Sequence, residues 1–94
     1  MEPPKKANIL LVDDEAALTK LMQTYLGKLG YNVESALQAT EALAIFGGDP
    51  QRFELLVADL TLPDLPGQEM AVRMLAQNPN LRILLCSGYP FCVD

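Results

Sequence analysis

Three acids and one hydroxyl stand at the ends of apolar runs in this sequence. Asp13 and Asp14 end one run, Asp59 ends a second, and Ser87 follows a third. Because a strand that is buried on both faces emerges only at its ends, such residues lie where the scaffold first meets water. Carboxylates without histidine form an oxygen-only site, which suits Mg²⁺. Beside such an ion, one carboxylate can act as a nucleophile toward phosphorus and form an aspartyl phosphate.

The segments that must position these side chains alternate between two patterns. Continuous aliphatic runs predict strands covered on both faces, and apolar residues at intervals of three and four predict amphipathic helices. The expected strands are residues 8–14, 31–36, 53–59 and 81–88, and the expected helices are residues 15–29, 40–46 and 67–77. The second strand is the least apolar and is expected at an edge. This alternation predicts an α/β fold, a parallel sheet with helices on its faces joined by right-handed crossovers.

The carboxyl ends of all strands in an open parallel sheet face one rim, where ligands bind. If the first and third strands are neighbours, Asp14 and Asp59 face each other although 45 positions separate them. Clustered carboxylates raise one another's pKa unless a cation is present. Ser87 is then expected to donate a hydrogen bond to a phosphoryl oxygen. Pro63 and Pro66 are expected to hold the loop that follows Asp59.

Each acid taken alone has a simpler explanation. An aspartate after a strand is most often a helix cap, and Asp14 or Glu15 would favour the start of the helix that follows. Asp64 lies in the turn after Asp59, where solvation explains it. Three acids and Ser87 at one rim favour a common site over a set of unrelated caps.

Composition limits the class of protein. A chain of 94 residues is one domain at most. A formal net charge of -5 disfavours direct nucleic-acid binding. The sequence shows neither a membrane-spanning apolar run nor a signal peptide, so we expect a cytoplasmic protein with no membrane partner. Two cysteines and no histidine exclude a zinc site on ligand count, and Cys86 and Cys92 are expected as reduced thiols.

The arrangement around Asp59 resembles the receiver domain of two-component response regulators, the CheY-like family. The resemblance covers about residues 8–89. It rests on "VDDE" after the first strand, on Asp59-x-x-Leu62-Pro63-x-Leu65-x-Gly67, and on Ser87 after the fourth strand. It implies a flavodoxin-like open sheet with strand order 2-1-3-4, formed by a single receiver domain over residues 1–94.

The resemblance also implies a role for each site residue. Asp59 would accept a phosphoryl group from the phosphohistidine of a histidine kinase, as a phosphoacceptor and not as a turnover enzyme. Asp13 and Asp14 would bind Mg²⁺ directly or through water, with Asp59 and the backbone carbonyl of Thr61 as further ligands. Ser87 would reorient toward the phosphoryl group and bias a surface that a partner reads.

The sequence departs from the family in one respect. Family members continue through a fourth helix, a fifth strand and a fifth helix, and the fifth strand supplies a lysine that contacts the phosphoryl group. This chain stops at Asp94, without a matching lysine. We therefore expect a truncated receiver that keeps metal binding better than phosphorylation. Its fourth strand is expected to be a sheet edge, and the 94-residue chain is expected to dimerise by edge pairing or through bared sheet faces.

Two other functions remain open from the sequence. A degenerate or truncated receiver would serve only as a protein-interaction or dimerisation module. A magnesium-dependent phosphatase with an aspartate nucleophile would ordinarily carry an Asp-x-Asp motif after the first strand, whereas Asp13 and Asp14 are adjacent.

Overall fold

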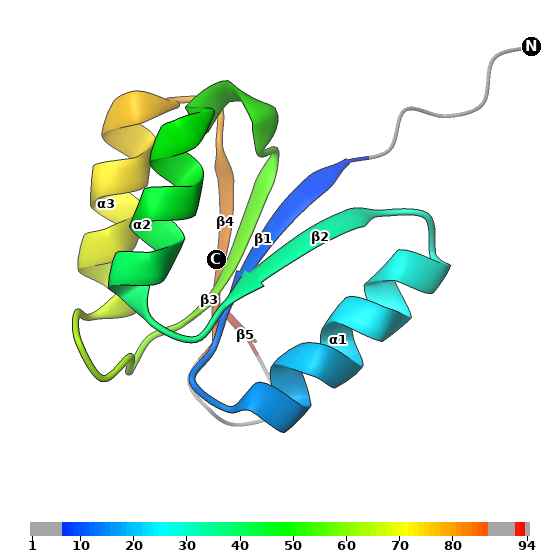
Figure 1. Ribbon diagram of the computed structural model, residues 1–94. Coiled ribbons are helices and arrows are strands. Elements are labelled where there is room, and N and C mark those ends of the chain that lie inside the picture. Colours follow the sequence, from blue (N-terminus) through cyan, green and yellow to red (C-terminus); the bar gives the residue numbers. More distant parts are fainter. Residues whose placement is uncertain (1–6, 87–91, 94) are drawn as a thin grey trace, which may run out of the picture.

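The chain folds into a twisted sheet with helices on both of its faces (Figure 1). The computed structural model describes residues 7–86 and 92–93. Its elements are β1 (Asn8–Val12), α1 (Ala16–Lys28), β2 (Asn32–Ala36), α2 (Ala39–Gly48), the 3-10 helix η1 (Pro50–Arg52), β3 (Leu55–Asp59), α3 (Gly67–Gln77), β4 (Arg82–Cys86) and β5 (Cys92–Val93). The strand order is β2-β1-β3-β4-β5, and the first four strands are parallel. The predicted 2-1-3-4 order is therefore confirmed.

The two central strands are the most apolar, as the sequence predicts. In β1, residues 9–12 are buried, and in β3, residues 56–59 are buried. The strands pair directly, with Ile9 opposite Leu55 and Val12 opposite Ala58. β2 lies at the edge of the sheet and is only partly buried. Burial on both faces thus explains the continuous aliphatic runs.

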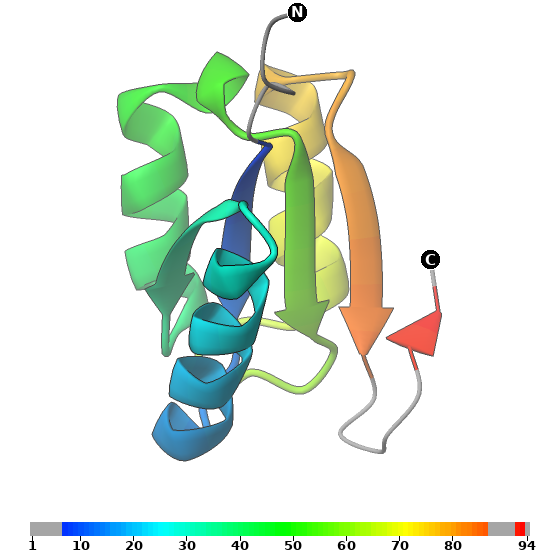
Figure 2. The ribbon, with the colours of Figure 1, turned by 90° about the vertical axis from the view of Figure 1, so that its right-hand side faces the viewer.

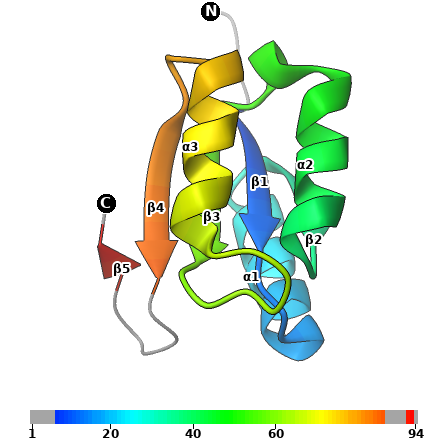
Figure 3. The ribbon, with the colours of Figure 1, turned by 90° about the vertical axis from the view of Figure 1, so that its left-hand side faces the viewer.

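The helices divide unequally between the two faces. α2 and α3 lie side by side on one face, and α1 lies on the other (Figures 1 and 3). The larger apolar cluster lies beneath α2 and α3 and includes Phe46 and Met70. The smaller one lies beneath α1, where Met22 and Leu26 pack against Ile9 and its neighbours. On the face of the sheet where α1 lies, Figure 2 shows no described helix over β3 and β4.

Two helix ends show how local sequence sets the boundaries. At the end of α1, Gly30 has a φ of 100°, a conformation that glycine adopts without steric cost. Its N–H donates to Gly27 and the Tyr31 N–H donates to Leu26, the pairing of a Schellman motif. α2 was expected to end at residue 46 but continues through residue 48. It ends before Asp49, because Pro50 disfavours the helical conformation for the residue that precedes it.

The end of the sheet corrects two expectations. β5 is antiparallel and pairs with the last two residues of β4, so that Cys92 lies opposite Cys86 in the register. Among the described residues, only the first part of β4, residues 82–84, has no strand paired on that side. Cys86 is disulfide-bonded, so the prediction of reduced thiols is wrong for this residue. Of the helices in the described part of the chain, none combines the length and apolar character that a bilayer crossing requires.

Candidate functional site

Three carboxylates meet at the carboxyl ends of β1 and β3. β1 ends at Val12, which lies opposite Ala58 in the register, so Asp13 and Asp14 leave the sheet beside Asp59. One carboxylate oxygen from each acid lies within 4.8 Å of the other two. Parallel pairing of the two strands brings together acids that are far apart in the sequence.

Asp59 is held more firmly than its two neighbours. It is only 7% exposed, whereas Asp13 is half-buried and Asp14 is exposed. Its Oδ1 accepts a hydrogen bond from the Thr61 N–H (3.1 Å) and one from the Thr61 hydroxyl (3.2 Å). Among the residues that the structure describes, no donor reaches its Oδ2. The buried acid is therefore fixed through one oxygen.

Asp13 has the perturbed acidity expected of a crowded carboxylate. Burial raises the pKa of its carboxyl, and the negative charges of Asp59 and Asp14 raise it further, whereas a hydrogen bond from the Glu15 N–H acts in the opposite direction. That bond joins the Glu15 nitrogen to Asp13 Oδ1 at 2.9 Å. The Thr19 hydroxyl lies within 3.2 Å of the Asp13 carbonyl and donates to it. The charged form of Asp13 is thus disfavoured unless a cation is near.

Helix capping does not account for the acids at this rim. The N-cap of α1 is Glu15, whose side chain makes no capping hydrogen bond. The donor set instead consists of carboxylate oxygens only, one from each acid, within 4.8 Å of one another. This chemistry fits a hard, oxygen-preferring ion such as Mg²⁺.

The loop after Asp59 is fixed by apolar and backbone contacts. Leu62 is buried in the larger apolar cluster, and Leu65 packs against that cluster. Gly67 begins α3 directly against the backbone of Asp59: a Cβ atom on Gly67 would lie 2.1 Å from the Asp59 carbonyl oxygen. Its N–H donates to the Leu60 carbonyl at 3.0 Å. Glycine is therefore required by close approach, a reason that sequence inspection did not supply.

Asp64 does more than face solvent, so the expectation for this residue is wrong. Its Oδ1 accepts the Ala39 N–H at 2.9 Å, and its Oδ2 accepts the Thr40 N–H at 2.8 Å. These hydrogen bonds from Thr40 and Ala39 lower the pKa of the exposed Asp64 carboxyl. No local sequence signal reveals the contact, because the helix it caps begins 25 residues earlier.

Two further residues were predicted at this site, Thr61 and Ser87. The Thr61 side chain lies against Asp59, and its backbone carbonyl stays a predicted metal ligand. Ser87 lies outside the described residues, so its predicted hydrogen bond to a phosphoryl group stays a prediction.

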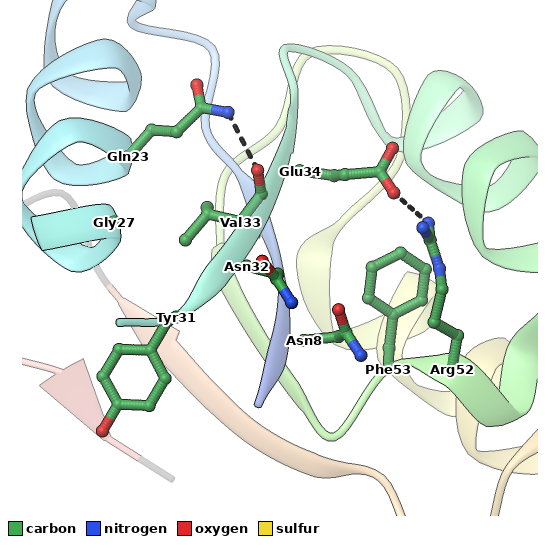
Figure 4. Close-up of a pocket in the computed structure, with 9 residues that line it drawn as sticks. All are labelled: Asn8, Gln23, Gly27, Tyr31, Asn32, Val33, Glu34, Arg52 and Phe53. Carbon is green, nitrogen blue, oxygen red and sulfur yellow. Dashed lines mark hydrogen bonds and ion pairs between the residues drawn. The ribbon is translucent and has the colours of Figure 1, made fainter. Parts of the chain in front are cut away.

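The hollow in Figure 4 lies at the opposite end of the sheet from the acids. It measures about 530 Å³, and Asn8, at the start of β1, is among the residues that line it. Within it Arg52 pairs with Glu34 and lies over the Phe53 ring, 4.4 Å from its centre. The Gln23 amide donates to the Val33 carbonyl at 2.9 Å. The polar side chains of the hollow thus make their contacts within the protein, and these contacts explain their presence there.

Comparison with known proteins places these observations in a family. The family model described as "Response regulator receiver domain" matches residues 9–91. The C4-dicarboxylate transport transcriptional regulatory protein DctD of Rhizobium meliloti is 33% identical over 82 residues, which cover 87% of this chain and 17% of that protein. The chain spans a third or less of the length of the curated relatives that it matches.

Two solved structures share the fold. One is a response regulator protein from Burkholderia pseudomallei with a phosphorylated aspartic acid, a calcium ion and citrate; it is 30% identical with a TM-score of 0.81, over 89% of this chain and 48% of that chain. The other is histidine kinase ThkA in complex with response regulator protein TrrA, where the match is 28% identical with a TM-score of 0.80, over 90% of this chain and 72% of that chain.

Replacing Asp13 by asparagine should stabilise the protein in the absence of divalent cations. Asparagine keeps the acceptor for the Glu15 N–H and removes a charge that repels Asp14 and Asp59. Two like charges about 5 Å apart in water repel by roughly 1 kcal/mol, so Asp13→Asn should raise the free energy of unfolding by about that amount at pH 7. Urea unfolding at low ionic strength measures it, with Glu54→Gln as the control, because Glu54 is exposed and precedes β3 at the end of the strand opposite Asp59.

The gain should depend on pH in a defined direction. Because the pKa of Asp13 is raised in the fold, the charged Asp13 carboxylate destabilises the fold fully above that pKa. This destabilisation is lost as the carboxylate is protonated at lower pH. The stabilisation by Asp13→Asn should therefore shrink as the pH falls through the raised pKa. An equal gain at every pH would show that charge repulsion is not its cause.

Gly67→Ala should destabilise the fold, because the new methyl group collides with the Asp59 carbonyl. Overpacking of this kind costs about 1–3 kcal/mol. The matched control is Gly27→Ala in α1, where an added Cβ meets nothing within 4 Å and helix propensity predicts a gain of about 1 kcal/mol. Thermal unfolding of both variants should shift the midpoint in opposite directions; a neutral Gly67→Ala would disprove the close approach.

Proposed function

The chain belongs to the response regulator receiver family, and we propose that its Asp59 accepts a phosphoryl group from the phosphohistidine of a histidine kinase. Residues 1–94 then act as a single receiver domain, a phosphoacceptor and not a turnover enzyme. The observation that carries the proposal is the buried Asp59 carboxylate, held through one oxygen beside two further acids. A phosphorylated aspartic acid in the similar Burkholderia pseudomallei protein supports the same chemistry.

The proposed reaction is a phosphoryl transfer between two protein side chains. One oxygen of the Asp59 carboxylate forms a bond to phosphorus, and the phosphorus–nitrogen bond of the phosphohistidine breaks. The electron pair of that bond stays on the imidazole nitrogen. Thr61 orients Asp59 through its N–H and hydroxyl, so the acid is ready before the donor arrives.

Asp13, Asp14 and Asp59 are the side chains that would hold Mg²⁺, with the Thr61 carbonyl as a further ligand. When bound, the ion would offset the negative charge of the carboxylates and of the incoming phosphoryl group. The raised pKa of Asp13 supports this assignment, because a site that disfavours its own charge gains most from a cation.

A histidine kinase is the proposed partner and phosphodonor. The similar chain in the complex of ThkA with TrrA supports a partner of this class. Ser87 is proposed to contact the phosphoryl group once it is on Asp59.

Acetyl phosphate with Mg²⁺ should add one phosphate to the protein, because Asp59 can displace acetate from phosphorus without a kinase. Intact-mass spectrometry measures the addition, and Asp59→Asn should abolish it. Asp49→Asn serves as the control, because it removes an exposed acid and keeps the acids of the cluster. Bound Mg²⁺ without phosphate addition would contradict the proposal and favour an interaction module, whereas sustained release of phosphate from many substrates would indicate a phosphatase.

A second candidate function is homodimerisation through the face that carries α1. Three large side chains of this helix and its end are mostly exposed: Leu21 (67%), Tyr25 (63%) and Leu29 (58%). On the same face, Leu55 and Leu84 are only partly buried. Exposed apolar surface of this kind favours association.

Light scattering at micromolar concentration should therefore give twice the monomer mass of 10.3 kDa. Leu21→Glu should return the mass to that of the monomer, because it places a charge within the apolar stripe. Val72→Glu on α3 is the control, since Val72 is equally exposed (61%) but lies on the opposite face of the sheet. A monomer at all concentrations would remove this candidate.

A further inference from the structure

Asp64 joins two parts of the chain that have no local connection. It lies in the loop between β3 and α3 and accepts the N–H groups of Ala39 and Thr40, the first two residues of α2. The N-cap residue of α2, Gln38, makes no capping hydrogen bond of its own. The first N–H groups of a helix lack partners within the helix and attract negative charge. Asp64 therefore caps α2 from a distant loop, in place of a local N-cap side chain.

The same loop is attached to Asp59 at both of its ends. Near the start, Thr61 donates two hydrogen bonds to the Asp59 carboxylate. At the end, Gly67 lies against the Asp59 carbonyl. Asp64 lies between these two attachments and fixes the middle of the loop to α2. The direction of the loop, and with it the position of Thr61, thus depends on a contact with another helix.

We propose that Asp64 is a positioning residue for phosphoryl transfer: by binding the start of α2 it sets the course of the loop that orients the Asp59 carboxylate through Thr61. This inference rests on the proposed function of Asp59. The Asp64 carboxylate accepts hydrogen bonds from the start of α2 and is not part of the carboxylate cluster. Its effect is on geometry, and small displacements of a reacting group reduce rates steeply.

A variant pair separates positioning from simple helix capping. Asp64→Ala removes both the cap and the tether. Adding Gln38→Asp restores a local cap on α2, since Gln38 already has the extended backbone of an N-cap residue, but it does not restore the link to the loop. The control is Asp49→Ala, which removes an exposed acid at the other end of α2 whose side chain makes no capping hydrogen bond.

The rate of phosphorylation by acetyl phosphate should fall on the order of tenfold in Asp64→Ala, because a small displacement of the Asp59 carboxylate slows its reaction. In Asp64→Ala with Gln38→Asp, the urea midpoint should return toward that of the unmodified protein while the rate stays low. Asp49→Ala should change neither quantity. Recovery of the rate together with the stability would show that Asp64 is only a cap, and would overturn the proposal.

Amide hydrogen exchange tests the tether without phosphorylation. In the double variant, the N–H groups of Thr61 and Gly67 should exchange on the order of tenfold faster, because the loop that carries them is released. Unchanged exchange at both positions would overturn the positioning role. If the unmodified protein takes up no phosphate, the proposed function of Asp59 fails, and the exchange measurement still decides whether Asp64 fixes the loop.

Discussion

Repulsion among three carboxylates within 4.8 Å is the constraint on which this molecule depends. A protein does not gather like charges at the end of its most apolar strands without some compensation. Here the compensation is partial: Thr61 satisfies one oxygen of Asp59, and the Glu15 N–H satisfies one oxygen of Asp13. Burial, and after it the charges of Asp59 and Asp14, raise the pKa of Asp13, so the charged form of this carboxyl is disfavoured. The fold therefore holds three acids whose mutual repulsion is only partly compensated by hydrogen bonds.

The parallel sheet makes this arrangement possible. β1 and β3 are buried on both faces, so their backbones are held rigidly up to the residues where the acids begin. Direct pairing of the two strands then fixes the distance between Asp13 and Asp59 to that between neighbouring strands. Rigid elements hold functional groups more precisely than loops do. Only the loop between Asp59 and Gly67 has to be fixed by other means.

Sequence patterns predicted most of the fold and the acidic cluster, because both depend on local hydrophobicity and on one topological rule. The runs before Asp14 and Asp59 indicated buried strands, and parallel pairing placed their ends together. Contacts between distant segments were missed. Asp64 was read as a solvated turn residue because its partners lie at the start of α2. β5 was missed as well, since two residues show no periodicity.

Gly67 and Asp64 connect residue 59 and the loop after it to two helices of the same layer. The main chain at residue 59 abuts the first turn of α3, and the loop beyond it is fastened to the first turn of α2. Both fastenings lie on the same side of the sheet, away from the exposed stripe of α1. Residue 59 and its loop are therefore connected to the layer formed by α2 and α3, whereas the hydrogen bonds between the acidic rim and α1 are accepted by Asp13.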